Sequence, residues 1–433
     1  MDDESSDDRH QPNVLSATAL SQLLGRGETT SIAVVESCLA RIEERDATLR
    51  AWAHVDRDRA LAQARARDAE PRRSPLHGVP IGIKDIFDTY DMPTSHGSKA
   101  FSGHRPTADS GIVALMRRAG LVILGKCATT EFATPIPIGV GNPRDLGRSP
   151  GVSSSGSAAS VADDMTPLSL GSQTGGSTIL PASFCGVVGF KASLTGLDRG
   201  GMRHLRPTLD SMGLFARELA DIALLNSVLS GRSAVQPPKH VADLRVGVCR
   251  TVNWSHAQPE TVAALDSASQ ALREAGARVM DAEMPPLFDD LEQSFQIIAT
   301  VEGARTMASD FEAHGPTMNH WLQETRRAGP TIDAARYEKA QLHALECQRS
   351  LGEIFERCDV IVTPSACGEA TRDLTGVSDS AFNRIWTLMH GPCISIPAFK
   401  GPNGMPVGIQ VVGPVGSDAR TIALAQCIGG VLA

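Results

Sequence analysis

Residues 148–160 read RSPGVSSSGSAAS, a stretch of serine and other small residues that composition alone would assign to a flexible linker. Its position indicates otherwise, because apolar runs lie on both sides of it, at residues 121–124 and 168–170. The run SGSAASVADDM (155–165) predicts a helix whose small side chains allow close packing on a neighbouring element. We therefore expect this stretch inside a core, and we ask which of its serines takes part in chemistry.

On both sides of this stretch, short apolar runs alternate with amphipathic segments, which predicts an α/β fold. The expected strands include LVILGK (121–126), LRVGVCR (244–250), CDVIVTP (358–364) and two strands within residues 393–414. The expected helices include residues 110–120, closed by Gly120, residues 262–275 and most of the region 300–357.

No long Pro-, Ser- or Gly-rich linker and no internal repeat divides the chain. We therefore expect an acidic, disordered N-terminal segment at residues 1–12, followed by a single domain over residues 13–433.

The composition excludes several function classes. A net charge of −8 argues against a nucleic-acid partner, which would require a basic face. No apolar stretch approaches the length of a membrane span. The 9 cysteines form no CxxC pair and no zinc-ligand spacing, and no secretory signal opens the sequence. We expect reduced thiols in a cytoplasmic protein without a metal site.

Several known catalytic motifs are absent from the sequence or incomplete in it. GLVILGKC (120–127) nearly spells a phosphate-binding loop, but its interior is strand-like and Cys127 lacks the hydroxyl that would hold Mg²⁺. The sequence contains no GxSxG, SxxK or HExxH motif. The 12 histidines are dispersed, so a histidine-based triad stays open as an alternative that no motif indicates. The motifs that remain carry lysine and serine.

The first remaining motif is HGVPIGIKDIF (77–87), which embeds Lys84 in an apolar run. Burial there disfavours the ammonium, so either an acidic partner compensates the charge or the amine becomes able to act as a base. The alternative is an ordinary surface lysine, or one paired with the adjacent Asp85.

The second remaining motif is GSQTGGSTILP (171–181). Gly175 and Gly176 would permit positive φ and turn several amides toward one point, beside a nucleophile at Ser177. The alternative is a tight turn before a helix.

Together with SSSGSAASVA (153–162), these motifs resemble in order and spacing the amidase signature family. The resemblance is dense over residues 76–185 and continues more thinly through RPTLDSMGLFARELAD, DVIVTP, NRIWTLMHGPCISIPA and GMPVGIQVVGP. It implies a large mixed central β-sheet covered by helices on both faces, with a signature core over about 76–200 and a helical substrate-pocket region over about 300–357. It also implies a Ser–cis-Ser–Lys triad of Lys84, Ser153 and Ser177.

Further roles follow from the resemblance and the chemistry of acyl transfer. The backbone amides of Thr174, Gly175, Gly176 and Ser177 would form an oxyanion hole, and Ser154 would orient Lys84. Val152 and Ser155 depart from the glycines usual in the family, and Gln173 replaces a common Asp. A cis peptide bond is expected before Ser153.

The resemblance leaves the substrate open. We expect a hydrolase acting on a small amide, anilide, urea or carbamate through an acyl-enzyme on Ser177, without a cofactor, and with a homodimer as one possible assembly. Thr130, Phe132 and Trp386 are candidate substrate residues, although Trp386 equally fits a plain core position. The alternative function is the glutaminase component of a tRNA-dependent amidotransferase. A non-enzymatic relative would require the loss of a triad residue, and all three are present.

Overall fold

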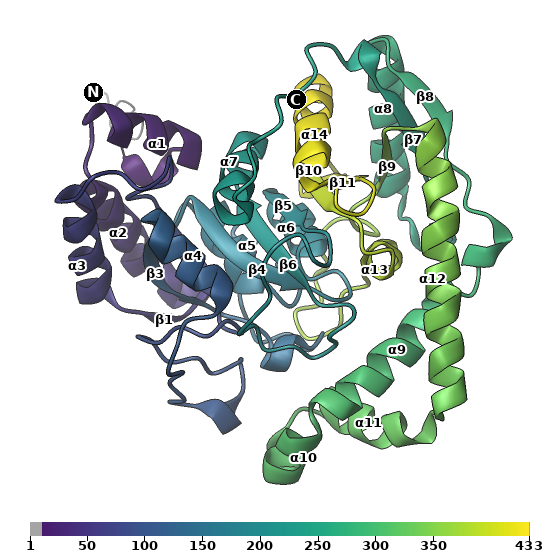
Figure 1. Ribbon diagram of the computed structural model, residues 1–433, viewed down its shortest axis with the longest axis horizontal. Helices are drawn as coiled ribbons and strands as arrows, with labels where there is room; N and C mark the ends of the chain where they lie inside the picture. The colour runs from purple at the N-terminus through teal and green to yellow at the C-terminus, as the bar shows by residue number, and fades with distance from the viewer. Residues whose placement is uncertain (1–10, 433) are drawn as a thin grey trace.

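The computed structural model describes residues 11–432. Their strands form one sheet, which runs across the molecule in Figure 1. In sheet order the strands are β1 (Trp52–Val55), β3 (Val122–Cys127), β2 (Pro80–Lys84), β4 (Leu168–Gln173), β6 (Ser211–Ala216), β5 (Val188–Lys191), β10 (Cys393–Lys400), β11 (Pro406–Val412), β9 (Val360–Pro364), β7 (Arg245–Val248) and β8 (Arg278–Asp281).

The sheet is mixed, as predicted. Strand β2 pairs in parallel with both β3 and β4, and β7 pairs in parallel with β8 and β9. Antiparallel pairs β4–β6, β5–β6, β5–β10, β10–β11 and β11–β9 join these two parallel groups. The sequence patterns identified most of these strands but not β1, β5 and β6, which are short or carry glycine.

The described residues contain the following α-helices: α1 (Ala17–Arg26), α2 (Ser31–Leu49), α3 (Arg57–Asp68), α4 (Gly111–Ala119), α5 (Ser155–Ala162), α6 (Ile179–Cys185), α7 (Leu219–Ser230), α8 (Pro259–Glu274), α9 (Leu291–Thr306), α10 (Ala308–His314), α11 (His320–Ala328), α12 (Ala334–Arg357), α13 (Ala381–Leu388) and α14 (Asp418–Leu432). The expected Gly120 cap of α4 is present, with a φ of 90°. The predicted helical region 300–357 corresponds to the end of α9 and to α10–α12, and α12 runs along one side of the molecule in Figure 1.

Helices cover both faces of the sheet, and the alternation of side chains along the strands shows how. In β9, Val360 and Val362 join a core cluster that includes residues of α4, α7, α8 and α14. The intervening Ile361 faces the other way, into a cluster with α9, α12 and α13. Successive side chains of a strand point to opposite faces, so the strands in the middle of the sheet are buried on both faces.

The serine-rich stretch lies in the interior, as expected. Every residue of α5 is buried, and this helix packs on β4 and α6. At Gly156, a β-carbon would lie only 2.3 Å from the carbonyl oxygen of Ala51 and 2.6 Å from the amide nitrogen of Ala128. The small side chains therefore allow backbone-to-backbone packing, and the stretch is not a linker.

Of the predicted N-terminal segment 1–12, residues 1–10 lie outside the described residues, and Pro12 begins a short 3-10 helix (Pro12–Val14). Among residues 11–432, no helix combines the length and apolar character needed to cross a bilayer.

Candidate active site

Lys84 is the last residue of β2 and is completely buried. Its Nζ lies 2.7 Å from Oγ of Ser153, 2.9 Å from Oγ of Ser154 and 2.9 Å from Oγ of Ser172. The Ser154 hydroxyl in turn donates to the carbonyl oxygen of Ser172, at 3.0 Å. Lys84 thus lies at the centre of three serine hydroxyls and forms no ion pair within residues 11–432.

The electrostatic setting favours the neutral amine. Burial lowers the pKa of Lys84 to about 7, while the carboxylate of Asp210 partly opposes this shift. The adjacent Asp85 is not its partner, because Asp85 pairs with the buried Lys126, at 3.1 Å. In β2 and β3, Ile83 aligns with Lys126, so strand alternation places Asp85 on the Lys126 side of the sheet.

Ser153 follows a cis peptide bond, Val152–Ser153, at the position where the sequence led us to expect one. Ser177 lies between β4 and α6 and is half-buried. No hydrogen bond joins Ser153 to Ser177 within residues 11–432. Catalytic hydrogen bonds are often longer in unliganded enzymes than in the reacting complex.

The segment Thr174–Ser177 connects β4 to the turn before α6. Its four backbone N–H groups donate to no atom of the described residues, and all four residues line a cavity. The side chain of Gln173 fixes the next turn, because its Oε1 accepts from the amides of Thr178 and Ile179, both at 3.0 Å. These four amides are therefore free to donate to a bound group.

The expected reason for the two glycines was wrong. Neither Gly175 nor Gly176 has a φ in the left-handed region. Gly176 is required for steric reasons instead, because a β-carbon there would lie 2.6 Å from Cβ of Ser380. The glycine lets this loop lie directly against the start of α13.

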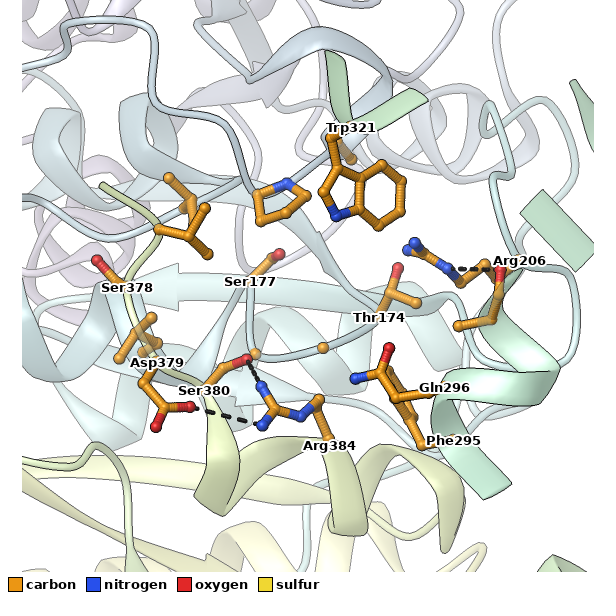
Figure 2. Close-up of a pocket in the computed structure, with 18 of the residues that line it drawn as sticks. Thr174, Ser177, Arg206, Phe295, Gln296, Trp321, Ser378, Asp379, Ser380 and Arg384 are labelled. Atoms are coloured by element: carbon orange, nitrogen blue, oxygen red, sulfur yellow. Dashed lines mark hydrogen bonds and ion pairs between the residues drawn. The ribbon is translucent and has the colours of Figure 1, made fainter. Parts of the chain in front are cut away.

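The cavity has a volume of about 380 Å³. Figure 2 shows Ser177 in its middle, with Trp321 and Arg206 on one side and Ser378, Asp379 and Ser380 on the other. The lining residues are Ala133, Pro135, Val152, Thr174, Gly175, Gly176, Ser177, Leu180, Arg206, Phe295, Gln296, Ala299, Thr300, Trp321, Val377, Ser378, Asp379, Ser380 and Arg384.

Known proteins resemble this chain in both sequence and fold. The model of the Amidase family matches residues 33–422. The chain belongs to the amidase family. It is 31% identical to a glutamyl-tRNA(Gln) amidotransferase subunit of Chloroflexus aggregans, over 92% of both chains. A crystal structure of an amidase superposes with a TM-score of 0.88 at 27% identity, covering 97% of this chain and all of that one. The peptide amidase from Stenotrophomonas maltophilia superposes with a TM-score of 0.83 at 26% identity, over 96% of both chains.

Three candidate substrate residues lie outside the cavity lining of this amidase-family chain. Thr130 is buried and donates to the carbonyl oxygen of Thr134. Phe132 packs in an aromatic cluster, with its ring centroid 5.7 Å from that of Phe101. Trp386 is fully buried in the core on α13, which agrees with the alternative interpretation of this residue. Their sequence neighbours Ala133 and Arg384 line the cavity instead.

The structure adds residues that the sequence patterns did not identify. Ser172 supplies the third hydroxyl around Lys84. It is the next-to-last residue of β4 and lies inside the motif GSQTGGSTILP, which was the only sign in the sequence that it could belong to the site. Trp321 comes from the helical region 300–357, where the resemblance implies a substrate pocket. Arg206 begins the segment RPTLDSMGLFARELAD (206–221), which carries part of the resemblance, but the resemblance assigned this arginine no role.

Proposed function

We propose that this amidase-family chain hydrolyses a carboxamide through an acyl-enzyme formed on Ser177. The observation that carries the proposal is Lys84, a buried lysine without a carboxylate partner in the described residues, held by three hydroxyls. A lysine in such a site can act as a general base near neutral pH.

The hydrogen bonds fit a neutral amine at Lys84. A neutral amine has two N–H groups and one lone pair. Because the Ser154 hydroxyl donates to a carbonyl oxygen, Nζ must be the donor to Ser154. A second N–H donates to Ser172, which leaves the lone pair facing Ser153.

The reaction then follows from this arrangement. As Ser177 attacks the amide carbon, its proton passes to Ser153 and the proton of Ser153 passes to Lys84. The amides of residues 174–177 hold the oxyanion, where the loss of one donor typically costs about 3–4 kcal/mol of transition-state stabilisation. The C–N bond breaks as the same relay returns a proton to the leaving nitrogen. Water hydrolyses the ester of Ser177 by the reverse route.

Of the two substrate classes we considered, sequence similarity favours the glutaminase component of an amidotransferase over a hydrolase of small amides. The amidotransferase relatives are more similar to this chain in sequence than the amidases of known structure. In that case the carboxamide is that of glutamine, and the released ammonia is used by a partner protein.

Ammonia release by the purified chain tests the proposal. Glutamine is compared with a panel of simple amides, anilides, ureas and carbamates, with and without candidate partner proteins. We expect turnover of at least one carboxamide that disappears in Ser177→Ala and in Lys84→Ala, while both variants remain folded. Turnover by Ser177→Ala at the wild-type rate would show the proposal to be wrong. Turnover of simple amides but never of glutamine would favour the small-amide interpretation.

A further inference from the structure

Arg206 places a buried guanidinium at the wall of the catalytic cavity. The residue is only 6% exposed, and it lines the same cavity as Ser177. Its Nε donates to the carbonyl oxygen of Ala299, at 3.1 Å. Neither Nη atom donates to any atom of residues 11–432. Figure 2 shows this free end directed into the cavity from the side of Thr174 and Trp321.

The other arginine of the cavity is in a different state. Arg384 donates through Nε to Glu292 at 2.9 Å, donates through Nη1 to Ser380 at 3.1 Å, and pairs through Nη2 with Asp379 at 3.5 Å. Its charge and its hydrogen bonds are therefore satisfied within the protein, whereas those of Arg206 are not.

Asp210 and Glu302 are the carboxylates whose charge acts on Arg206, and both accept hydrogen bonds from other groups. Asp210 accepts from the backbone amides of Leu205 at 2.7 Å and Arg206 at 2.9 Å. Glu302 accepts from Thr208 at 2.5 Å and from the Tyr337 hydroxyl at 3.0 Å. Neither forms an ion pair with the Arg206 guanidinium.

Arg206 is also held rigidly. Its Cζ lies 4.8 Å from the ring centroid of Trp321, in a cation–π contact, and its backbone is anchored by Asp210. A fixed, planar guanidinium with two free Nη groups matches the geometry of a carboxylate, which it can bind through two parallel hydrogen bonds.

We propose that Arg206 determines specificity by binding a carboxylate of the amide substrate. The substrate class is then an amide that carries a carboxylate besides the scissile carboxamide, such as the monoamide of a dicarboxylic acid or an amino-acid amide side chain. This inference rests on the proposed hydrolysis at Ser177. The residue is a binding residue and takes no part in proton transfer.

The test uses matched ligands that differ only in charge. Succinamate is compared with succinamide, and malonamate and glutaramate are each compared with their diamides to cover different spans. Dissociation constants are measured by calorimetry on Ser177→Ala, which prevents turnover. We expect at least one monoamide to bind about 10- to 100-fold more tightly than its diamide, the range expected for charge-assisted hydrogen bonds.

Arg206→Gln in the Ser177→Ala background should bring that ratio to about 1, and Arg206→Lys should leave an intermediate ratio because it keeps the charge and loses the planar fork. Arg203→Gln is the matched control, because Arg203 lies in the same loop, pairs with Asp310 and does not line the cavity. Equal binding of all pairs, no binding of any monoamide, or an unchanged ratio in both Arg206 variants would overturn the inference. Labelling of Ser177 by a neutral fluorophosphonate reports separately on the proposed hydrolysis, so the two failures are distinguishable.

Discussion

The pH dependence of turnover follows from the burial of Lys84. The base must be neutral to accept a proton, and burial lowers the pKa of Lys84 to about 7. The value of kcat/KM should therefore be low in acid and rise to a plateau with a midpoint near pH 7. With this pKa the neutral fraction rises from about 9% near pH 6 to about 91% near pH 8, a tenfold gain. A lysine with its ordinary pKa would give a gain of about 100-fold over the same interval and would continue to rise beyond pH 9.

The assay is ammonia release from a neutral amide at constant ionic strength between about pH 5.5 and 9.5. Asp210→Asn supplies a perturbation of known sign, because the Asp210 carboxylate raises the pKa of Lys84. Its removal should move the midpoint to lower pH. A profile that is flat, or that still rises tenfold per unit above pH 8, would refute the assignment of Lys84 as the neutral base.

Three further variants test separate parts of the structure. Ser172→Ala removes one of the three hydroxyls around Lys84 and should lower kcat by about three- to tenfold, the effect of one hydrogen bond, as measured by steady-state kinetics; an unchanged kcat would remove Ser172 from the site. Gly156→Ala would introduce a β-carbon 2.3 Å from a backbone oxygen and should lower the free energy of unfolding by about 1–3 kcal/mol in urea titrations; wild-type stability would mean that the serine-rich helix packs loosely. Lys126→Met leaves the buried Asp85 carboxylate without its cation and should cost about 3–5 kcal/mol of unfolding free energy at neutral pH, and a cost below about 1 kcal/mol would contradict the buried pair.

Short continuous apolar runs and turn residues predicted most of the sheet, because strands such as β3 and β9 are buried on both faces. They did not predict β5 and β6, where glycine interrupts short runs whose strand conformation depends on pairing with distant segments. Adjacency in sequence suggested Asp85 as the partner of Lys84, but successive residues of a strand point to opposite faces, and Asp85 reaches Lys126.

In the candidate site, too, some residues could be predicted from the sequence and others could not. The resemblance to the amidase signature family predicted Lys84, Ser153, Ser154 and the segment Thr174–Ser177, because each of them stands inside a motif that carries the resemblance. Arg206 could not be found in this way, because the resemblance assigned it no role. Its meaning depends on Trp321 and Ala299, which come from helices that are distant in sequence and whose packing no local pattern records.

The proposed hydrolysis depends on Ser177 as the nucleophile, and peptide mapping by mass spectrometry identifies the reacting residue. The chain is treated with a neutral fluorophosphonate, digested, and examined for the modified residue. We expect a single adduct on Ser177, absent in Ser177→Ala and formed far more slowly in Lys84→Ala. An adduct on a different serine, or labelling of Ser177 at an unchanged rate without Lys84, would contradict it.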